Sequence, residues 1–220
     1  MRMKVIITGS TGMVGEGVML VCLEQPQITD VLVINRKPIV HKHPKLKELI
    51  VKDFSTIGDF KASLTDYDAC FFCAGVSSIG HTEESFTKAT FDFVIPFAKT
   101  LSSINPNMTF TYVSGSGTDS TEQGKVMWAR VKGRTENTLL TLPFKQVYNF
   151  RPGFMKPVKG QQNLLSFYRY LGFLTPLFMA VFSKWSCTLN EVPIAMIHCV
   201  SRGYSSSTLE VSDIKLQAKP

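Results

Sequence analysis

The chain has 220 residues, of which 44% are hydrophobic and 19% charged, and its formal net charge is +7. This composition excludes a disordered chain and suffices for one well-buried domain, which we expect to span residues 1–220. The lysines are scattered, without a basic run or interleaved aromatic residues, so we expect no nucleic-acid partner. We attribute the positive charge to a solvated surface and to the binding of a phosphorylated ligand.

The five cysteines are an odd number, and several lie within apolar runs. This usage favours reduced, buried thiols in a cytoplasmic protein. Cys70 and Cys73 form a C-x-x-C pair, but the pair lies in a strand-like stretch, whereas a redox C-x-x-C opens a helix. Core packing is therefore the favoured interpretation. The four histidines show no metal-ligand spacing, so we expect no metal site.

The first two thirds of the chain alternate apolar strands with helical segments. Strands are expected at Lys4–Thr8, Val31–Asn35, Glu48–Val51, Ala69–Cys73, Met108–Val113 and Gln146–Phe150. Helices are expected at Met13–Leu23, from Thr82 towards Ser103, at Lys125–Leu142 and from near Asn190 towards Val200. This alternation predicts an α/β fold, a doubly wound parallel sheet of the Rossmann type. Residues from about 158 to 220 are expected to form a small, mainly helical portion that covers the cleft.

The segment Leu164–Phe182 is strongly apolar. Arg169, Gly172 and Pro176 interrupt it, so we expect two short helices around a turn and no membrane-spanning helix. A lid over the cleft or a homodimer interface is the favoured role. Peripheral contact with a membrane remains a less favoured alternative.

The strongest motif is G-x-x-G-x-x-G, formed by Gly9, Gly12 and Gly15 between the first strand and the first helix. Gly9 permits a tight turn, Gly12 lets the backbone approach a pyrophosphate, and Gly15 lets the helix pack closely on the sheet. Strand, glycines and helix in this order predict a dinucleotide site. Its predicted residues are Gly9, Ser10, Thr11, Gly12, Met13 and Val14.

The end of the second strand carries Asn35-Arg36-Lys37. A protein that selects NAD usually has an acidic residue there, which binds the ribose hydroxyl. The Arg36 guanidinium can instead form paired hydrogen bonds to a 2′-phosphate, and Lys37 adds charge. We therefore predict NADP as the cofactor, with NADPH bound more tightly than NADH.

Two further strand ends are predicted to contact the cofactor. Asp53 can accept a hydrogen bond from the adenine amino group while Phe54 packs on the base, although a helix N-cap is nearly as well supported for Asp53. Cys73, Ala74 and Gly75 follow the fourth strand. Their small size lets the backbone run close to the ribose and diphosphate.

Over about residues 3–157 the chain resembles the atypical short-chain dehydrogenase/reductases, which are NAD(P)-binding Rossmann proteins, and especially their small oxidoreductase-like branch that includes Tat-interacting proteins. The resemblance rests on the glycine loop, Arg36, Asp53, Ala74-Gly75, Ser114, Lys132-Gly133 with Glu136, and Arg151-Pro152-Gly153. It implies that Ser114 and Lys132 are catalytic and that Lys132 also binds the nicotinamide ribose. It further implies that the backbone of Arg151, Pro152 and Gly153 passes the nicotinamide carboxamide.

Trp128 departs from the pattern of the family. The family spaces its catalytic pair as Tyr-x-x-x-Lys, and Trp128 stands at the tyrosine position before Lys132. An indole N–H donates a hydrogen bond but does not ionise near neutral pH, and nothing places Tyr168, Tyr170 or His81 as a substitute proton donor.

Two functions follow from this departure. One is a weak or altered carbonyl/alcohol oxidoreductase that acts on a small molecule. The other is a non-catalytic, dinucleotide-sensing regulatory or interaction protein.

Overall fold

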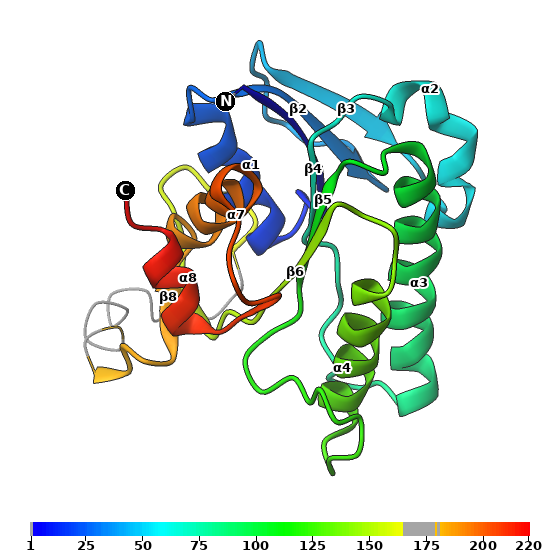
Figure 1. The fold of residues 1–220 in the computed structure, drawn as a ribbon, viewed down its shortest axis with the longest axis vertical. Coiled ribbons are helices and arrows are strands. Elements are labelled where there is room, and N and C mark those ends of the chain that lie inside the picture. The colour runs from blue at the N-terminus through cyan, green and yellow to red at the C-terminus, as the bar shows by residue number, and fades with distance from the viewer. Residues whose placement is uncertain (1, 165–178, 180) are drawn as a thin grey trace.

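The computed structural model describes residues 2–164, 179 and 181–220. Its main feature is a seven-stranded parallel sheet in the order β3-β2-β1-β4-β5-β6-β9 (Figure 1). The strands are β1 (Met3–Thr8), β2 (Ile28–Asn35), β3 (Leu46–Ile50), β4 (Ala69–Phe72), β5 (Thr109–Val113), β6 (Gln146–Phe150) and β9 (Thr208–Leu209). The chain builds outward from β1 through β2 to β3, and then crosses to β4 on the other side of β1. The doubly wound Rossmann fold is thus confirmed, and its topological switch point lies between β1 and β4.

Helices cover both faces of the sheet (Figure 1). One face packs against α1 (Met13–Glu24), α7 (Glu191–Arg202) and α8 (Val211–Gln217). The other packs against η1 (Phe54–Phe60), α2 (Lys61–Leu64), α3 (Glu83–Ile104) and α4 (Met127–Leu140). Val5 and Ile7 belong to the first core, and Ile6 belongs to the second. This burial on both faces explains why β1 is a continuous β-branched run without polar alternation.

The start of α3 matches its sequence signal. The Thr82 hydroxyl accepts a hydrogen bond from the backbone N–H of Ser85 at 3.3 Å and so caps the helix. Glu83 and Glu84 follow in the first turn, where negative charge is stabilised by the helix dipole. The helix therefore begins where the sequence predicts, directly after Thr82.

The C-terminal portion contains short strands as well as the expected helices. β7 (Phe154–Lys156) pairs in parallel with β8 (Ser186–Thr188), and β9 adds to the main sheet beside β6. A Cβ on Gly153 would lie 2.0 Å from the Trp185 carbonyl oxygen, so only glycine permits this approach. The two short helices predicted for 164–182 fall mostly outside the described residues. Within the described ranges, no helix is long and apolar enough to cross a bilayer.

Candidate functional site

A cavity of about 250 Å³ lies at the carboxyl ends of β1, β2 and β4, at the switch point of the sheet. Ligands of doubly wound sheets bind at this position. The lining residues come from five parts of the chain: the glycine loop, the end of β2, the start of η1, the end of β4 and one side of α3. They are Gly9, Thr11, Gly12, Ile34, Asn35, Arg36, Phe54, Cys73, Ala74, Gly75, Val76, Lys88, Ala89 and Phe93.

The glycine loop has the shape of an anion cradle. Gly9 has φ +73°, and a Cβ there would lie 2.7 Å from the backbone of Ala74. A Cβ on Gly15 would lie 2.3 Å from the Gly9 carbonyl oxygen, so α1 packs directly on the loop. Gly12 caps α1 without a side-chain hydrogen bond, and first-turn N–H groups have no partners within a helix. These donors at the cavity fit a pyrophosphate, so the residues present fit a dinucleotide.

Hydrogen bonds fix the loop to the neighbouring strand ends. The buried Ser10 donates its N–H to Asn35 Oδ1 at 3.1 Å and accepts from Asn35 Nδ2 at 2.8 Å. The Thr8 hydroxyl accepts from the N–H groups of Cys73 and Ala74, each at 3.2 Å. Ser10 therefore supports the loop and does not line the cavity. Of the other predicted loop residues, Met13 and Val14 pack against the hydrophobic core and do not line it either.

Of the two residues predicted to contact the adenine, Asp53 caps a helix and Phe54 lines the cavity. Asp53 caps η1 by accepting from the Ser55 N–H at 2.9 Å, and this bond lowers the pKa of Asp53. Phe54 is 4% exposed and stacks on Phe93, with 4.8 Å between the ring centroids. Both rings line the cavity, so they form an apolar wall. Asp53 lies outside the lining, in the N-cap role that the sequence left open.

The charged lining differs in part from the expectation. Arg36 lines the cavity as predicted, whereas Lys37 is exposed and does not. Lys88 of α3 takes part instead, next to Ala89. Lys88 could not be predicted from the sequence, because its place in the lining depends on how α3 packs beside the ends of β2 and β4. The helix start at Thr82 was the available signal, since it places the second helical turn close to the end of β4.

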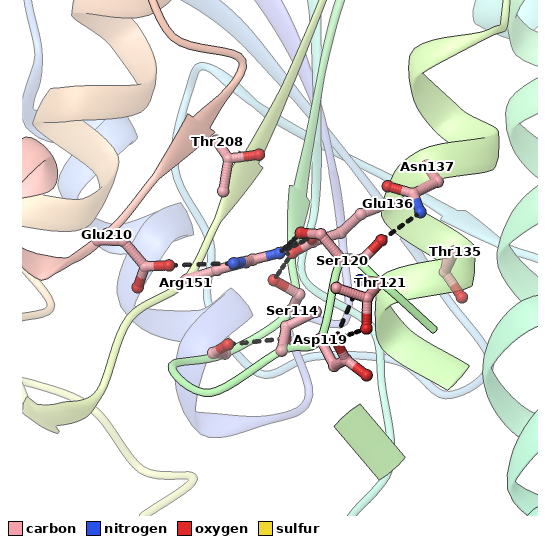
Figure 2. Close-up of polar contacts among 12 residues, drawn as sticks. Ser114, Asp119, Ser120, Thr121, Thr135, Glu136, Asn137, Arg151, Thr208 and Glu210 are labelled. Atoms are coloured by element: carbon pink, nitrogen blue, oxygen red, sulfur yellow. Dashed lines mark hydrogen bonds and ion pairs between the residues drawn. The ribbon is translucent and has the colours of Figure 1, made fainter. Parts of the chain in front are cut away.

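Ser114 follows β5 and points into the protein. Its hydroxyl donates to the Glu136 carboxylate (Figure 2). The Phe150 carbonyl oxygen, at 3.2 Å, shares the single proton of this hydroxyl. Ser114 is 4% exposed, and its own carbonyl oxygen accepts a hydrogen bond from Lys132 Nζ. The structure thus brings Ser114 and Lys132 together as predicted, but through the backbone of Ser114. The hydroxyl of Ser114 is engaged in a buried polar network.

Arg151 is the centre of this network. Its Nε donates to both Glu136 carboxylate oxygens at 3.0 and 3.2 Å, and its Nη1 donates to Glu210 at 3.1 Å. Its Nη2 donates to Ser120 and to Glu136 (Figure 2). The side chains of Glu136 and Arg151 are 1% and 10% exposed. Burial opposes the charge of Arg151, but the two carboxylates outweigh it and raise its pKa. The network therefore locks the ends of β5, β6 and β9 to α4.

Lys132 and Trp128 share one face of α4, since they are four residues apart. Burial lowers the pKa of Lys132, while Glu136 acts in the opposite direction. A Cβ on Gly117 would lie 3.5 Å from the Trp128 ring, so the indole lies against the loop that follows β5. Lys132 thus holds a half-buried ammonium beside this loop, with an indole where the family has a phenol.

Ser116 is a candidate that the sequence analysis missed. Its N–H donates to the Pro152 carbonyl oxygen at 3.0 Å, and the residue is half-buried. Among the described residues no hydrogen bond to its hydroxyl is present. Strand alternation could have shown that Ser114 points inward, because the buried Tyr112 faces α3 and α4 and Ser114, two residues on, continues on that buried face. Alternation gives no signal for Ser116, which lies beyond the end of β5. Of the other predicted residues in this region, Arg151, Pro152 and Gly153 do not line the cavity.

Glu16 joins the glycine-loop helix to the C-terminal portion. Its carboxylate is fully buried and accepts from His41 Nε2 at 2.8 Å, from the Gln162 N–H at 3.0 Å and from the Asn163 N–H at 2.7 Å. Burial alone would raise the pKa of Glu16, but these hydrogen bonds outweigh it, and the pKa is lowered. The chain before residue 165 is thereby anchored to the first turn of α1.

Comparison with known proteins gives two relatives of moderate identity. The leucinostatins biosynthesis cluster protein T of Purpureocillium lilacinum is 28% identical over 171 residues, which cover 76% of this chain and 62% of that protein. The mitochondrial protein FMP52 of Meyerozyma guilliermondii is 25% identical over 154 residues, which cover 70% of this chain and 65% of that protein. The chain thus spans less than two thirds of the length of each relative.

Solved structures share the fold at low identity. A short chain dehydrogenase family protein from Francisella tularensis matches with a TM-score of 0.66 at 16% identity, over 96% of each chain. The ADP-L-glycero-D-manno-heptose-6-epimerase of Helicobacter pylori matches with a TM-score of 0.66 at 15% identity, over 97% of this chain and 79% of that one. At these identities the matches confirm the expected Rossmann fold. The family model described as NAD dependent epimerase/dehydratase matches residues 5–121, and the chain belongs to this family of NAD(P)-binding Rossmann proteins.

Proposed function

We propose that the protein is an NADP(H)-dependent oxidoreductase that interconverts a small carbonyl compound and its alcohol, with weak or altered catalysis. The observation that carries the proposal is that Arg36 shares one cavity with the glycine loop. The described residues that line this cavity include no carboxylate, the group that NAD-selective sites usually use to bind the ribose hydroxyls. A guanidinium at this position favours a 2′-phosphate.

The proposal gives each part of the site one task. The backbone of Gly9 to Gly12 and the first turn of α1 hold the pyrophosphate, and Arg36 holds the 2′-phosphate. Lys132 binds the nicotinamide ribose, in keeping with the family. When bound, the nicotinamide supplies or accepts the hydride.

The region between β5 and α4 binds the substrate oxygen in this proposal. We assign the hydrogen bond to that oxygen to Ser116, because the Ser114 hydroxyl is already used by Glu136 and Phe150. The Lys132 ammonium stabilises developing negative charge on the same oxygen. Trp128 lacks the ionisable proton that a tyrosine would transfer, and such assistance is typically worth about 10²–10⁴-fold in rate. This loss is the physical reason to expect slow turnover.

Turnover across a panel of aldehydes and ketones tests the proposal. NADPH consumption is followed for the wild type, for Trp128→Tyr and for Trp128→Phe, the matched control that keeps an aromatic ring without a hydroxyl. Slow wild-type turnover that rises about 10²-fold or more only in Trp128→Tyr supports it. Brisk wild-type turnover with no gain in the tyrosine variant would contradict the role given to position 128.

The second candidate is a non-catalytic, dinucleotide-sensing protein, and Trp128 is the observation that favours it. NADPH binding without turnover in the wild type or in Trp128→Tyr would select this candidate. Under either function we propose a small-molecule ligand, a cytoplasmic location and, as an alternative to a monomer, a homodimer. All five cysteines are free, which agrees with a reducing compartment.

A further inference from the structure

Lys88 reaches the nucleotide cavity from a different wall than Arg36 does. Arg36 follows β2, whereas Lys88 lies in the second turn of α3, and both line the same cavity of about 250 Å³. The aromatic rings of Phe54 and Phe93 line the same cavity and form an apolar wall. We expect an adenine ring to pack on this wall and to direct its ribose towards the two cations.

The partner of Lys88 in the structure is easily displaced. Lys88 Nζ contacts Glu84 at 2.7 Å, one helical turn earlier, and the two side chains are 69% and 80% exposed. Exposed i,i+4 ion pairs on helices contribute little to stability. A phosphate monoester carries more charge and three acceptor oxygens, so it competes well for the same ammonium.

We propose that Lys88 is a specificity-determining residue that binds the ribose 2′-phosphate of NADP(H) together with Arg36. This inference rests on the proposed function, and it assigns to Lys88 of α3 the added positive charge that was predicted for Lys37. Lys37 is exposed and lies outside the cavity lining. Glu84 then acts against the cofactor, because its carboxylate holds Lys88 in the absence of the phosphate.

The test compares two small probes that differ in the 2′-phosphate: adenosine 2′,5′-bisphosphate and 5′-AMP. Both are titrated calorimetrically into the wild type, Lys88→Ala and Lys99→Ala. Lys99 is an exposed lysine further along α3 that does not line the cavity, so it is the matched control. A lost charge-assisted contact typically lowers affinity about tenfold or more. Lys88→Ala is expected to lose about tenfold for the bisphosphate and nothing for 5′-AMP, and Lys99→Ala to change neither.

A second variant makes the prediction directional. Glu84→Gln removes the competing carboxylate and is expected to raise bisphosphate affinity about twofold, the equivalent of an exposed i,i+4 ion pair. Lys88→Arg keeps the charge and is expected to retain most of the binding.

Several results would overturn the inference. Equal losses for both probes in Lys88→Ala would place Lys88 at the base or the 5′-phosphate, and no loss would remove it from the site. A wild type that prefers the bisphosphate while Lys88→Ala behaves as wild type refutes the role of Lys88 alone. A wild type that binds both probes equally refutes the NADP preference and, with it, this inference.

Discussion

Replacing Glu136 by glutamine is expected to destabilise the protein strongly. The side chains of Glu136 and Arg151 are 1% and 10% exposed, so the substitution leaves a buried guanidinium without its main counter-charge. Removing one partner of a buried ion pair typically costs about 3–5 kcal/mol. Glutamine keeps the size of the side chain and one acceptor oxygen, so we expect the lower end, about 3 kcal/mol. With a urea m-value of about 2 kcal/mol/M, the unfolding midpoint falls by roughly 1.5 M.

Glu210 provides the matched control, because it contacts the same arginine from the surface. Its side chain is 47% exposed, and its oxygen lies 3.1 Å from Arg151 Nη1. Exposed ion pairs contribute about 0–1 kcal/mol, so Glu210→Gln is expected to cost no more than about 1 kcal/mol. Urea unfolding at pH 7, followed by tryptophan fluorescence, measures both variants. Similar losses in the two variants would refute the reasoning that burial at Glu136 sets the cost.

Three further predictions concern the cavity, the β5 loop and the Glu16 anchor. Gly12→Val is expected to abolish NADPH binding with a near-wild-type urea midpoint, because a Cβ there meets only the Gly9 oxygen at 3.5 Å and the rest of the side chain fills the cradle; wild-type affinity would contradict this. Ser116→Ala is expected to lower turnover without loss of stability, whereas Ser114→Ala is expected to lower the free energy of unfolding by about 1 kcal/mol; the reverse pattern would exchange their roles. Glu16→Gln is expected to lose stability at pH 7: since the folded pKa is lowered from 4.5, the contribution of the carboxylate is fully present above about pH 4.5 and is lost progressively as the pH falls from there through the folded pKa. Urea midpoints that differ by the same amount at pH 7 and pH 4 would refute it.

The part of the site that the sequence predicts best is the glycine loop. A continuous apolar strand, three spaced glycines and a helix are all local signals, and the contacts of Gly9 and Gly15 show why no larger residue fits there. Arg36 could be predicted equally well, because the sequence places it directly after the second strand. Local pattern and backbone geometry point to the same residues in this region.

Residues that depend on packing between distant elements could not be found this way. Lys88 lines the cavity because of the way α3 packs on the sheet. Lys37 directly follows Arg36 in the chain, yet it is exposed and does not line the cavity. Ser114 matches the family by position, yet its side chain points inward and contacts Glu136, because strand alternation sets the face on which it lies. The two residues of β9 carry no periodicity of their own, and only the sheet edge at β6 makes them a strand.

The central claim is that Arg36 selects NADP(H) at the glycine-loop cavity, and a direct binding titration tests it. NADPH and NADH are titrated into the wild type, Arg36→Ala and Lys37→Ala, the last being the control outside the cavity lining. The wild type and Lys37→Ala are expected to bind NADPH about tenfold or more tighter than NADH, and Arg36→Ala to lose that preference while binding NADH as before. Equal affinities of the wild type for the two cofactors would contradict the account.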